Sequence, residues 1–209
     1  MEQLKRGKQR HMTVHRIIEE QASRDGDRVA IADADVTLSY RQLNQRANAF
    51  ARYLVASGFR RGSLATVRLE RSPDAAIVLL GILKAGGKYS LIDDDGAPSE
   101  WPGGVCFQIG TTDEECRQQI DVSSALALPA GSVANLPILA RGEDIACVLQ
   151  GGNGSPQVLV PHATIASLQL KPAPRIVTWT GEPGALDLWM ALMTGATVAL
   201  DGHLFESAA

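Results

Sequence analysis

One glycine-rich stretch in the last third of the chain has the backbone chemistry of a phosphate-binding loop. The segment VLQGGNGSPQVLVPH, residues 148–162, contains four turn-forming residues in a row: Gly151, Gly152, Asn153 and Gly154. Such residues allow positive φ and a close approach to a ligand, so that backbone N–H groups could line an anion site. Polar side chains are scarce, because the stretch has one hydroxyl, that of Ser155, and no lysine. A tightened loop without any ligand is the alternative, since a bare glycine cluster is a weak motif.

The other polar residues form no recognisable catalytic or metal-binding pattern. The four histidines lack metal-ligand spacing with any cysteine or carboxylate pair: His11, His15, His162 and His203. The sequence has no G-x-S-x-G elbow and no complete P-loop. We therefore expect no catalytic residue and no bound metal in this chain.

Composition indicates an ordinary α/β protein with an aliphatic core. Of the 209 residues, 45% are hydrophobic and only 5% aromatic, so aliphatic side chains must supply most of the packing. The net charge of −3 argues against a nucleic-acid or membrane surface, either of which requires a basic field. Three cysteines without a C-x-x-C pair, and no apolar run near membrane-spanning length, favour a cytoplasmic location.

The first residues differ in composition from the rest of the chain. Residues 1–16 contain five basic side chains and one acidic side chain in a polar run that cannot form a core. We expect residues 1–12 to be a disordered tail, or an artificial leader joined to an original start at Met12, with a docking segment as the alternative. Residues 13–209 are expected to form one domain.

Hydrophobic periodicity predicts helices and strands in alternation. Helices are expected at 13–24, with Thr13 as a cap, and at 40–57, ending at Gly58. The runs around 32–35 have the pattern of a hairpin. The remaining predicted elements are strands at 63–70, 88–93, 105–110, 145–150, 175–179 and 196–200, helices at 73–86, 162–169 and 185–195, and a loop at 93–102. A strand, helix and strand over 63–93 form a βαβ unit, which implies parallel strands and a mostly parallel sheet flanked by helices.

Several of these segments, in this order, resemble the adenylation domains of nonribosomal peptide synthetases, within the adenylate-forming, AMP-binding family. The first two core motifs of the family usually read LTYxEL and LKAGxAYVPLD, and here they correspond to LSYRQL and LKAGGKYSLID. The third and fourth correspond to residues 144–162 and 185–200. The resemblance spans about residues 14–200 and implies the N-terminal subdomain fold of these enzymes. Within the second motif, Lys84 is expected to lie solvated near a helix end.

The third motif departs most from the family pattern. It usually reads YTSGSTGxPKG, in which backbone N–H groups, Ser and Thr hydroxyls and a Lys hold the phosphates of ATP. This chain has the shorter segment QGGNGSPQV, with Gln157 in the place of the Lys. A neutral amide cannot replace an ammonium group beside a triphosphate, because a charge-assisted hydrogen bond is roughly twice as strong as a neutral one. The resemblance therefore implies a vestigial phosphate loop over 151–155. His162 keeps the place of a family His, as a ligand contact or, as we expect, a helix start.

The fourth motif suggests a vestigial substrate residue. In relatives an Asp of this motif lies beside the α-ammonium of the amino-acid substrate, and Glu182 falls at its position, with Asp187 at the acidic helix position. Glu182 is interpreted either as a residual amine contact or as an exposed loop acid. Family members continue through the adenine, Mg²⁺ and ribose sites to a C-terminal domain with the catalytic Lys. The sequence ends before these segments, so a truncated domain is expected.

Two functional hypotheses follow from this resemblance. The first is a catalytically inactive, truncated adenylation-like domain with a structural or protein-interaction role in a synthetase assembly line, without a cofactor. Expected partners are condensation or carrier domains, an MbtH-like protein or a second copy. The alternative is the N-terminal half of a split amino-acid-adenylating enzyme, which another chain completes and which then uses ATP and Mg²⁺.

Overall fold

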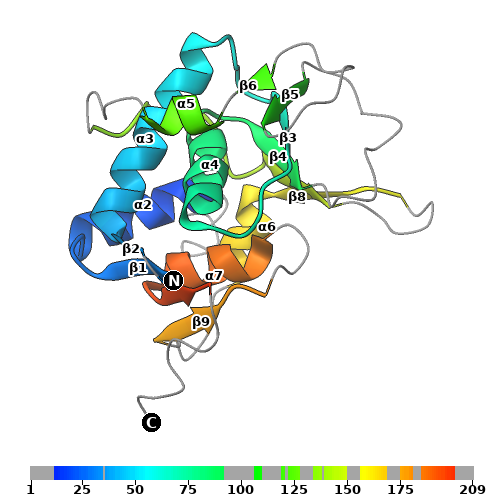
Figure 1. The fold of residues 1–209 in the computed structure, drawn as a ribbon. Coiled ribbons are helices and arrows are strands. Elements are labelled where there is room, and N and C mark those ends of the chain that lie inside the picture. Colours follow the sequence, from blue (N-terminus) through cyan, green and yellow to red (C-terminus); the bar gives the residue numbers. More distant parts are fainter. Residues whose placement is uncertain are drawn as a thin grey trace.

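The structure, a computed structural model, contains two β-sheets with helices between and around them (Figure 1). It describes residues 12–34, 36–91, 106–109, 119–120, 122–127, 134–137, 139–149, 156–168, 175–180 and 185–200. The described helices are α2 (Val14–Arg24), α3 (Tyr40–Ala56), α4 (Pro73–Lys84), α5 (Val122–Ala127), α6 (His162–Ser167) and α7 (Leu186–Thr194). The described strands are β1 (Val29–Ala32), β2 (Thr37–Ser39), β3 (Leu64–Val67), β4 (Lys88–Leu91), β5 (Cys106–Ile109), β6 (Gln119–Ile120), β7 (Ile145–Leu149), β8 (Val158–Pro161), β9 (Ile176–Thr178) and β10 (Thr197–Ala199).

All the helices and strands predicted from the sequence are present, and the α/β fold class is confirmed. The structure adds β6, α5 and β8, which the periodicity did not indicate. The loop expected at 93–102 lies outside the described residues, as do residues 1–11 of the expected tail.

The larger sheet has the strand order β6-β5-β3-β4-β7-β8. The predicted βαβ unit forms it in part: β3 and β4 pair in parallel, from Leu64 opposite Lys88 to Val67 opposite Leu91, and α4 connects them. Only β8 is antiparallel, and it pairs with β7 as a hairpin. The glycine-rich segment therefore joins the two strands of this hairpin.

The smaller sheet has the order β2-β1-β10-β9. It contains two strands from the beginning of the described chain and two from its end. β1 and β2 form the predicted hairpin, while β1 pairs in parallel with β10 and β10 with β9. Strand β10 lies more than 160 residues after β1, so this pairing is not visible in any local pattern. The single sheet suggested by the sequence is thus divided into two.

Helix α7 connects the two sheets through the core. It packs against β9 and β10 of the smaller sheet, while the indole N–H of its Trp189 donates to the Tyr89 hydroxyl of β4 at 2.6 Å. The Tyr40 hydroxyl, at the start of α3, lies 2.7 Å from the Ala196 carbonyl and 3.1 Å from that of Leu192. These buried polar bonds join α3, α7 and both sheets into one hydrophobic core.

The helix ends agree with the sequence prediction at α3 and differ from it at α2. Ser39 and Gln42 form a capping box before α3, and Gly58, with φ of 96°, follows its end. The expected capping of α2 by the Thr13 side chain is wrong. Thr13 occupies the N-cap position, but its hydroxyl pairs with the His15 ring instead of a backbone amide, at 3.1 Å.

Gly87, between α4 and β4, is expected to tolerate no side chain. A Cβ at this position would lie 2.2 Å from the Phe59 ring and 3.0 Å from the Ser63 carbonyl oxygen, and Phe59 is fully buried. Overpacking of this kind costs about 1–3 kcal/mol. We expect Gly87→Ala to lower the free energy of unfolding by about 2 kcal/mol in urea denaturation.

Gly62 provides the matched control for Gly87. Its φ of 81° makes any side chain strained, but a Cβ there would have nothing within 4 Å. Gly62→Ala should therefore cost about 1 kcal/mol, from backbone strain alone. The steric explanation predicts that Phe59→Leu recovers stability in Gly87→Ala and not in Gly62→Ala, and equal effects in both backgrounds would contradict it.

Candidate functional site

The carboxyl ends of the parallel strands β3, β4 and β7 meet at one edge of the larger sheet. The register of β3 with β4, and the pairing of Tyr89 with Cys147, place the segments that follow these strands side by side. In open α/β sheets, ligands bind outside the carboxyl ends of the strands. The glycine-rich segment begins where β7 ends, so this edge is the candidate site.

The residues predicted to bind ligand lie outside the described residues. These are Gly151, Gly152, Asn153, Gly154 and Ser155 in the loop, together with Glu182. The residues on either side of the loop are described: Leu149 pairs with Val158, and Gln157 lies directly before β8. In sequence, the loop residues connect these two strands.

Arg71 joins the segment after β9 to the same edge. Its guanidinium, in the connection between β3 and α4, donates a hydrogen bond to the Thr180 carbonyl oxygen. The Thr180 amide and hydroxyl both donate to one Asp187 carboxylate oxygen, at 2.8 and 2.9 Å. Thr180, which follows β9, is thereby bonded to the first turn of α7. No sequence pattern indicates the role of Arg71, whereas an acid in the first turn of a helix, such as Asp187, does indicate a contact at the helix start.

The N-terminus of α4 also opens at this edge, but it is poorly suited to a phosphate. The Ser72 hydroxyl accepts a hydrogen bond from the Ala75 amide at 3.1 Å, which satisfies one of the free donors. Asp74 adds a carboxylate to the first turn, where the helix dipole would otherwise favour an anion. Neither side chain assists the binding of a triphosphate.

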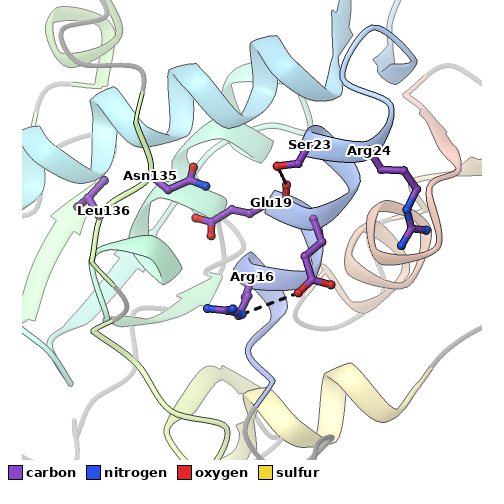
Figure 2. A pocket seen from close by; sticks show the side chains of 7 residues that line it. Arg16, Glu19, Ser23, Arg24, Asn135 and Leu136 are labelled. Carbon is purple, nitrogen blue, oxygen red and sulfur yellow. Dashed lines mark hydrogen bonds and ion pairs between the residues drawn. The ribbon is translucent and has the colours of Figure 1, made fainter.

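A separate polar groove of about 630 Å³ lies on α2 (Figure 2). It is lined by Arg16, Glu19, Glu20, Ser23, Arg24, Asn135 and Leu136. The Ser23 hydroxyl donates to the Glu19 backbone carbonyl at 2.9 Å, and Arg16 forms an ion pair with Glu20 at 3.8 Å. These local interactions involve several of the polar groups in the lining, which contains both acidic and basic side chains.

Lys84 lies buried beneath α2, so the expectation that it is solvated is wrong. Its ammonium forms an ion pair with Glu19, and the two side chains are 1% and 13% exposed. Burial lowers the pKa of Lys84, and the Glu19 carboxylate opposes that shift. A lysine at a helix end is usually solvated, but here α2 packs across the end of α4 and supplies the carboxylate.

His162 is the first residue of α6, as expected, and it is fully buried against His15 of α2. The two rings meet edge to face with centroids 5.5 Å apart. Burial lowers the pKa of His162 to about 4, while the Asp144 carboxylate acts in the opposite direction. Burial, followed by the charges of His162, Lys84 and Arg16, also holds the pKa of His15 well below its usual value.

The described part of the chain shows no metal centre and no candidate membrane span. No three His, Cys, Asp or Glu side chains there are placed to hold a metal ion together. None of the helices there combines the length and the apolar composition needed to cross a bilayer. Cys147 is buried in β7 as a free thiol.

These features define an α/β protein whose candidate site lies at the carboxyl edge of a largely parallel sheet. Within this class, the chain belongs to the AMP-binding enzyme family, whose model matches residues 18–148. Tyrocidine synthase 3 of Brevibacillus parabrevis is 30% identical over 92% of the chain, which spans 3% of that synthase. Tyrocidine synthase 1 of the same organism is 30% identical over 89% of the chain, which spans 20% of it.

Solved structures show the same fold. The N-terminal subdomain of Klebsiella oxytoca NpsA matches 91% of this chain with a TM-score of 0.77 and 23% identity, and the chain spans 55% of that subdomain. An artificially fused adenylation-PCP di-domain, NpsA-ThdA, matches with a TM-score of 0.76 at 21% identity, and the chain spans 39% of it. The chain thus has the fold of an adenylation N-terminal subdomain over about half of that subdomain's length.

Proposed function

We propose that this chain is a catalytically inactive adenylation-like domain with a structural or protein-interaction role in a nonribosomal peptide synthetase assembly line. The observation that carries the proposal is the composition of the phosphate loop. Gln157 takes the place of the family's lysine, and Ser155 is the only hydroxyl residue between β7 and Gln157. The side chains that hold a triphosphate in the family pattern are absent from this segment.

The electrostatics of the edge favour this proposal. Holding ATP and its developing charge requires cationic groups that act in a site shielded from water. Arg71 is a cation at the edge, but its guanidinium is already bonded to the Thr180 carbonyl oxygen. Asp74 lies in the helix turn that faces the edge and would repel a phosphate. Backbone donors of the glycines alone would have to supply most of the binding.

The proposal predicts that the isolated chain does not bind ATP. Isothermal titration with ATP and Mg²⁺ should give no heat of binding up to about 1 mM ligand, which corresponds to less than about 4 kcal/mol of affinity. The N-terminal subdomain of Klebsiella oxytoca NpsA, solved with anthranilyl-AMSN, is the control and should bind that compound in the same experiment. Micromolar, Mg²⁺-dependent binding of ATP to this chain would overturn the inactive assignment.

The interaction role is supported by the kind of protein to which the chain is similar and by one apolar strand. The synthases that it matches are many times longer than the chain, which spans 3% of Tyrocidine synthase 3. Val158 and Leu159, consecutive residues of the edge strand β8, are 54% and 49% exposed. An exposed edge strand with apolar side chains is a site at which another chain can pair.

Candidate partners of this cytoplasmic protein are the condensation and carrier domains of the same assembly line, an MbtH-like protein or a second copy of the chain. Light scattering tests self-association, and pull-downs with each purified partner test the others. Replacement of Val158 and Leu159 by Ser should weaken the complex that forms. A monomer that captures none of these partners would remove the interaction role.

The second candidate function is the N-terminal half of a split amino-acid-adenylating enzyme. It is favoured by the hydrogen bonds that Thr180 donates to Asp187, the residue at the acidic helix position of the fourth motif. In that case another chain would supply the missing cationic groups, ATP and Mg²⁺ would bind to the complex, and amino-acid-dependent exchange of pyrophosphate into ATP would appear on mixing. Exchange in the complex without ATP binding to the isolated chain distinguishes this function from the first.

A further inference from the structure

Helix α2 is capped by a histidine that lies 148 positions further along the chain. The amide of Val14, the first residue of α2, donates to Nδ1 of His162 at 3.4 Å. The first amides of a helix have no partner within the helix, so they need an acceptor from outside it. The cap-position residue, Thr13, supplies no such bond from its side chain. His162 acts as the acceptor only while Nδ1 carries no proton.

The same histidine is fixed to the base of the β7–β8 hairpin. Its own amide donates to the Asp144 carbonyl oxygen at 3.0 Å, and the next amide, that of Ala163, donates to the Gly142 carbonyl oxygen at 2.8 Å. Asp144 directly precedes β7, and His162 directly follows β8. His162 therefore connects α2 to the end of the hairpin opposite the glycine-rich loop.

The two histidines have unused buried nitrogen atoms at their contact. His15 and His162 are 3% and 0% exposed. Within the described residues, His15 Nδ1 and His162 Nε2 have no hydrogen-bond partner. A proton added to either ring would create a buried cation beside the other ring, without a carboxylate in hydrogen-bond contact.

We propose that His15 and His162 form an acid-sensitive latch, which holds α2 on the base of the hairpin at neutral pH and releases it in mild acid. Protonation of His162 at Nδ1 removes the acceptor for Val14 and places a positive charge at the positive end of the helix dipole. The latch concerns conformation and does not depend on whether the chain binds ATP.

The charged groups around the latch act in both directions on its response to acid. Arg16 on α2 and Lys84 on α4 both oppose a positive charge on His15, although Lys84 is paired with Glu19. The Asp144 carboxylate favours a positive charge on His162, but it is bonded in bidentate geometry to Arg61, at 2.8 and 2.9 Å. On α7, which also packs against α6, the only charged residue is Asp187, and its carboxylate accepts hydrogen bonds from Thr180 and Leu188.

Release of α2 would expose one apolar face and break a further hydrogen bond. Val14, Ile17 and Ile18 form the buried face of the helix. The Gln21 side chain donates to the Met193 carbonyl oxygen of α7 at 2.8 Å, and this bond would also be lost. The released state therefore presents α2 together with the part of the core that it covers.

Hydrogen exchange of the backbone amides tests the latch directly. With the pKa of His162 at about 4 in the closed state and 6.5 when exposed, opening should become about 30-fold more frequent between pH 7.5 and pH 5. Protection factors of α2 should fall by that factor, whereas those of the buried middle of α3 should stay constant. A uniform change in both helices, or no change in α2, would overturn the proposal.

The variant His162→Asn separates a latch from a merely structural contact. Its side-chain oxygen can still accept a hydrogen bond but does not titrate, so protection of α2 should lose the part of its pH dependence that comes from His162 and keep only the part from His15. A fall in protection as large as in the wild type would overturn the proposal. If the variant does not fold, NMR titration of the wild-type imidazole Cε1 protons decides, because the latch requires both rings to titrate well below 6.5 while α2 remains closed.

Discussion

Glu19→Gln is expected to lower the free energy of unfolding by about 3 kcal/mol, a large effect for a change of one surface-helix side chain. The substitution keeps the shape of the side chain and removes the charge that pairs with Lys84. The Lys84 side chain is only 1% exposed, so its ammonium group would remain buried without a counter-ion. Breaking a buried ion pair by removal of one partner costs about 3–5 kcal/mol. Urea denaturation at pH 7 measures the change.

Glu20→Gln, on the next position of the same helix, is the control for this prediction. Glu20 pairs with Arg16, but the two side chains are 54% and 48% exposed, and an exposed pair contributes at most about 1 kcal/mol. The double variant Glu19→Leu with Lys84→Met should recover most of the stability, since an apolar pair can replace a buried ion pair. Similar losses from Glu19→Gln and Glu20→Gln would contradict the assignment of a buried pair.

The local elements of this fold could be predicted from the sequence because their signals are local. The helical spacing of apolar residues located α3, and Gly58 marked its end, where φ is 96°. Strand β8 was missed, since its four residues end in a proline and lie soon after a glycine-rich stretch of sequence. The division into two sheets depends on the pairing of β1 with β10, for which no local pattern exists.

For the candidate site, the sequence carries information on residue chemistry and none on geometry. The replacement of lysine by Gln157 is a property of residue types, and it is visible without coordinates. The bond from Arg71 to Thr180 joins residues 109 positions apart in the connections of two different sheets. Lys84 illustrates the same limit, because its counter-ion lies on α2, 65 positions earlier. Contacts of this kind depend on tertiary packing, which overrides the usual solvation of a lysine.

The free energy of unfolding is expected to fall by about 3 kcal/mol as the pH is lowered from 7 to 4, from His162 alone. Its pKa is about 4 in the folded protein and near 6.5 in the unfolded chain, so the unfolded state binds the proton first. Stability is therefore greatest above pH 6.5 and is lost as the pH falls toward 4, at about 1.4 kcal/mol for each pKa unit. His15, whose pKa is also depressed, acts in the same direction.

Urea denaturation at intervals between pH 7.5 and pH 4 measures this slope for the wild type, His162→Asn and His15→Asn. Each variant should lose its own part of the pH dependence, and the double variant should be nearly flat above pH 4. Asp144 does not confuse the measurement, because bonding to Arg61 lowers the pKa of its carboxyl below 3.8 and moves its protonation to more acid conditions. If the free energy of unfolding of the double variant depended on pH as strongly as that of the wild type, the acid sensitivity would come from groups other than the two histidines.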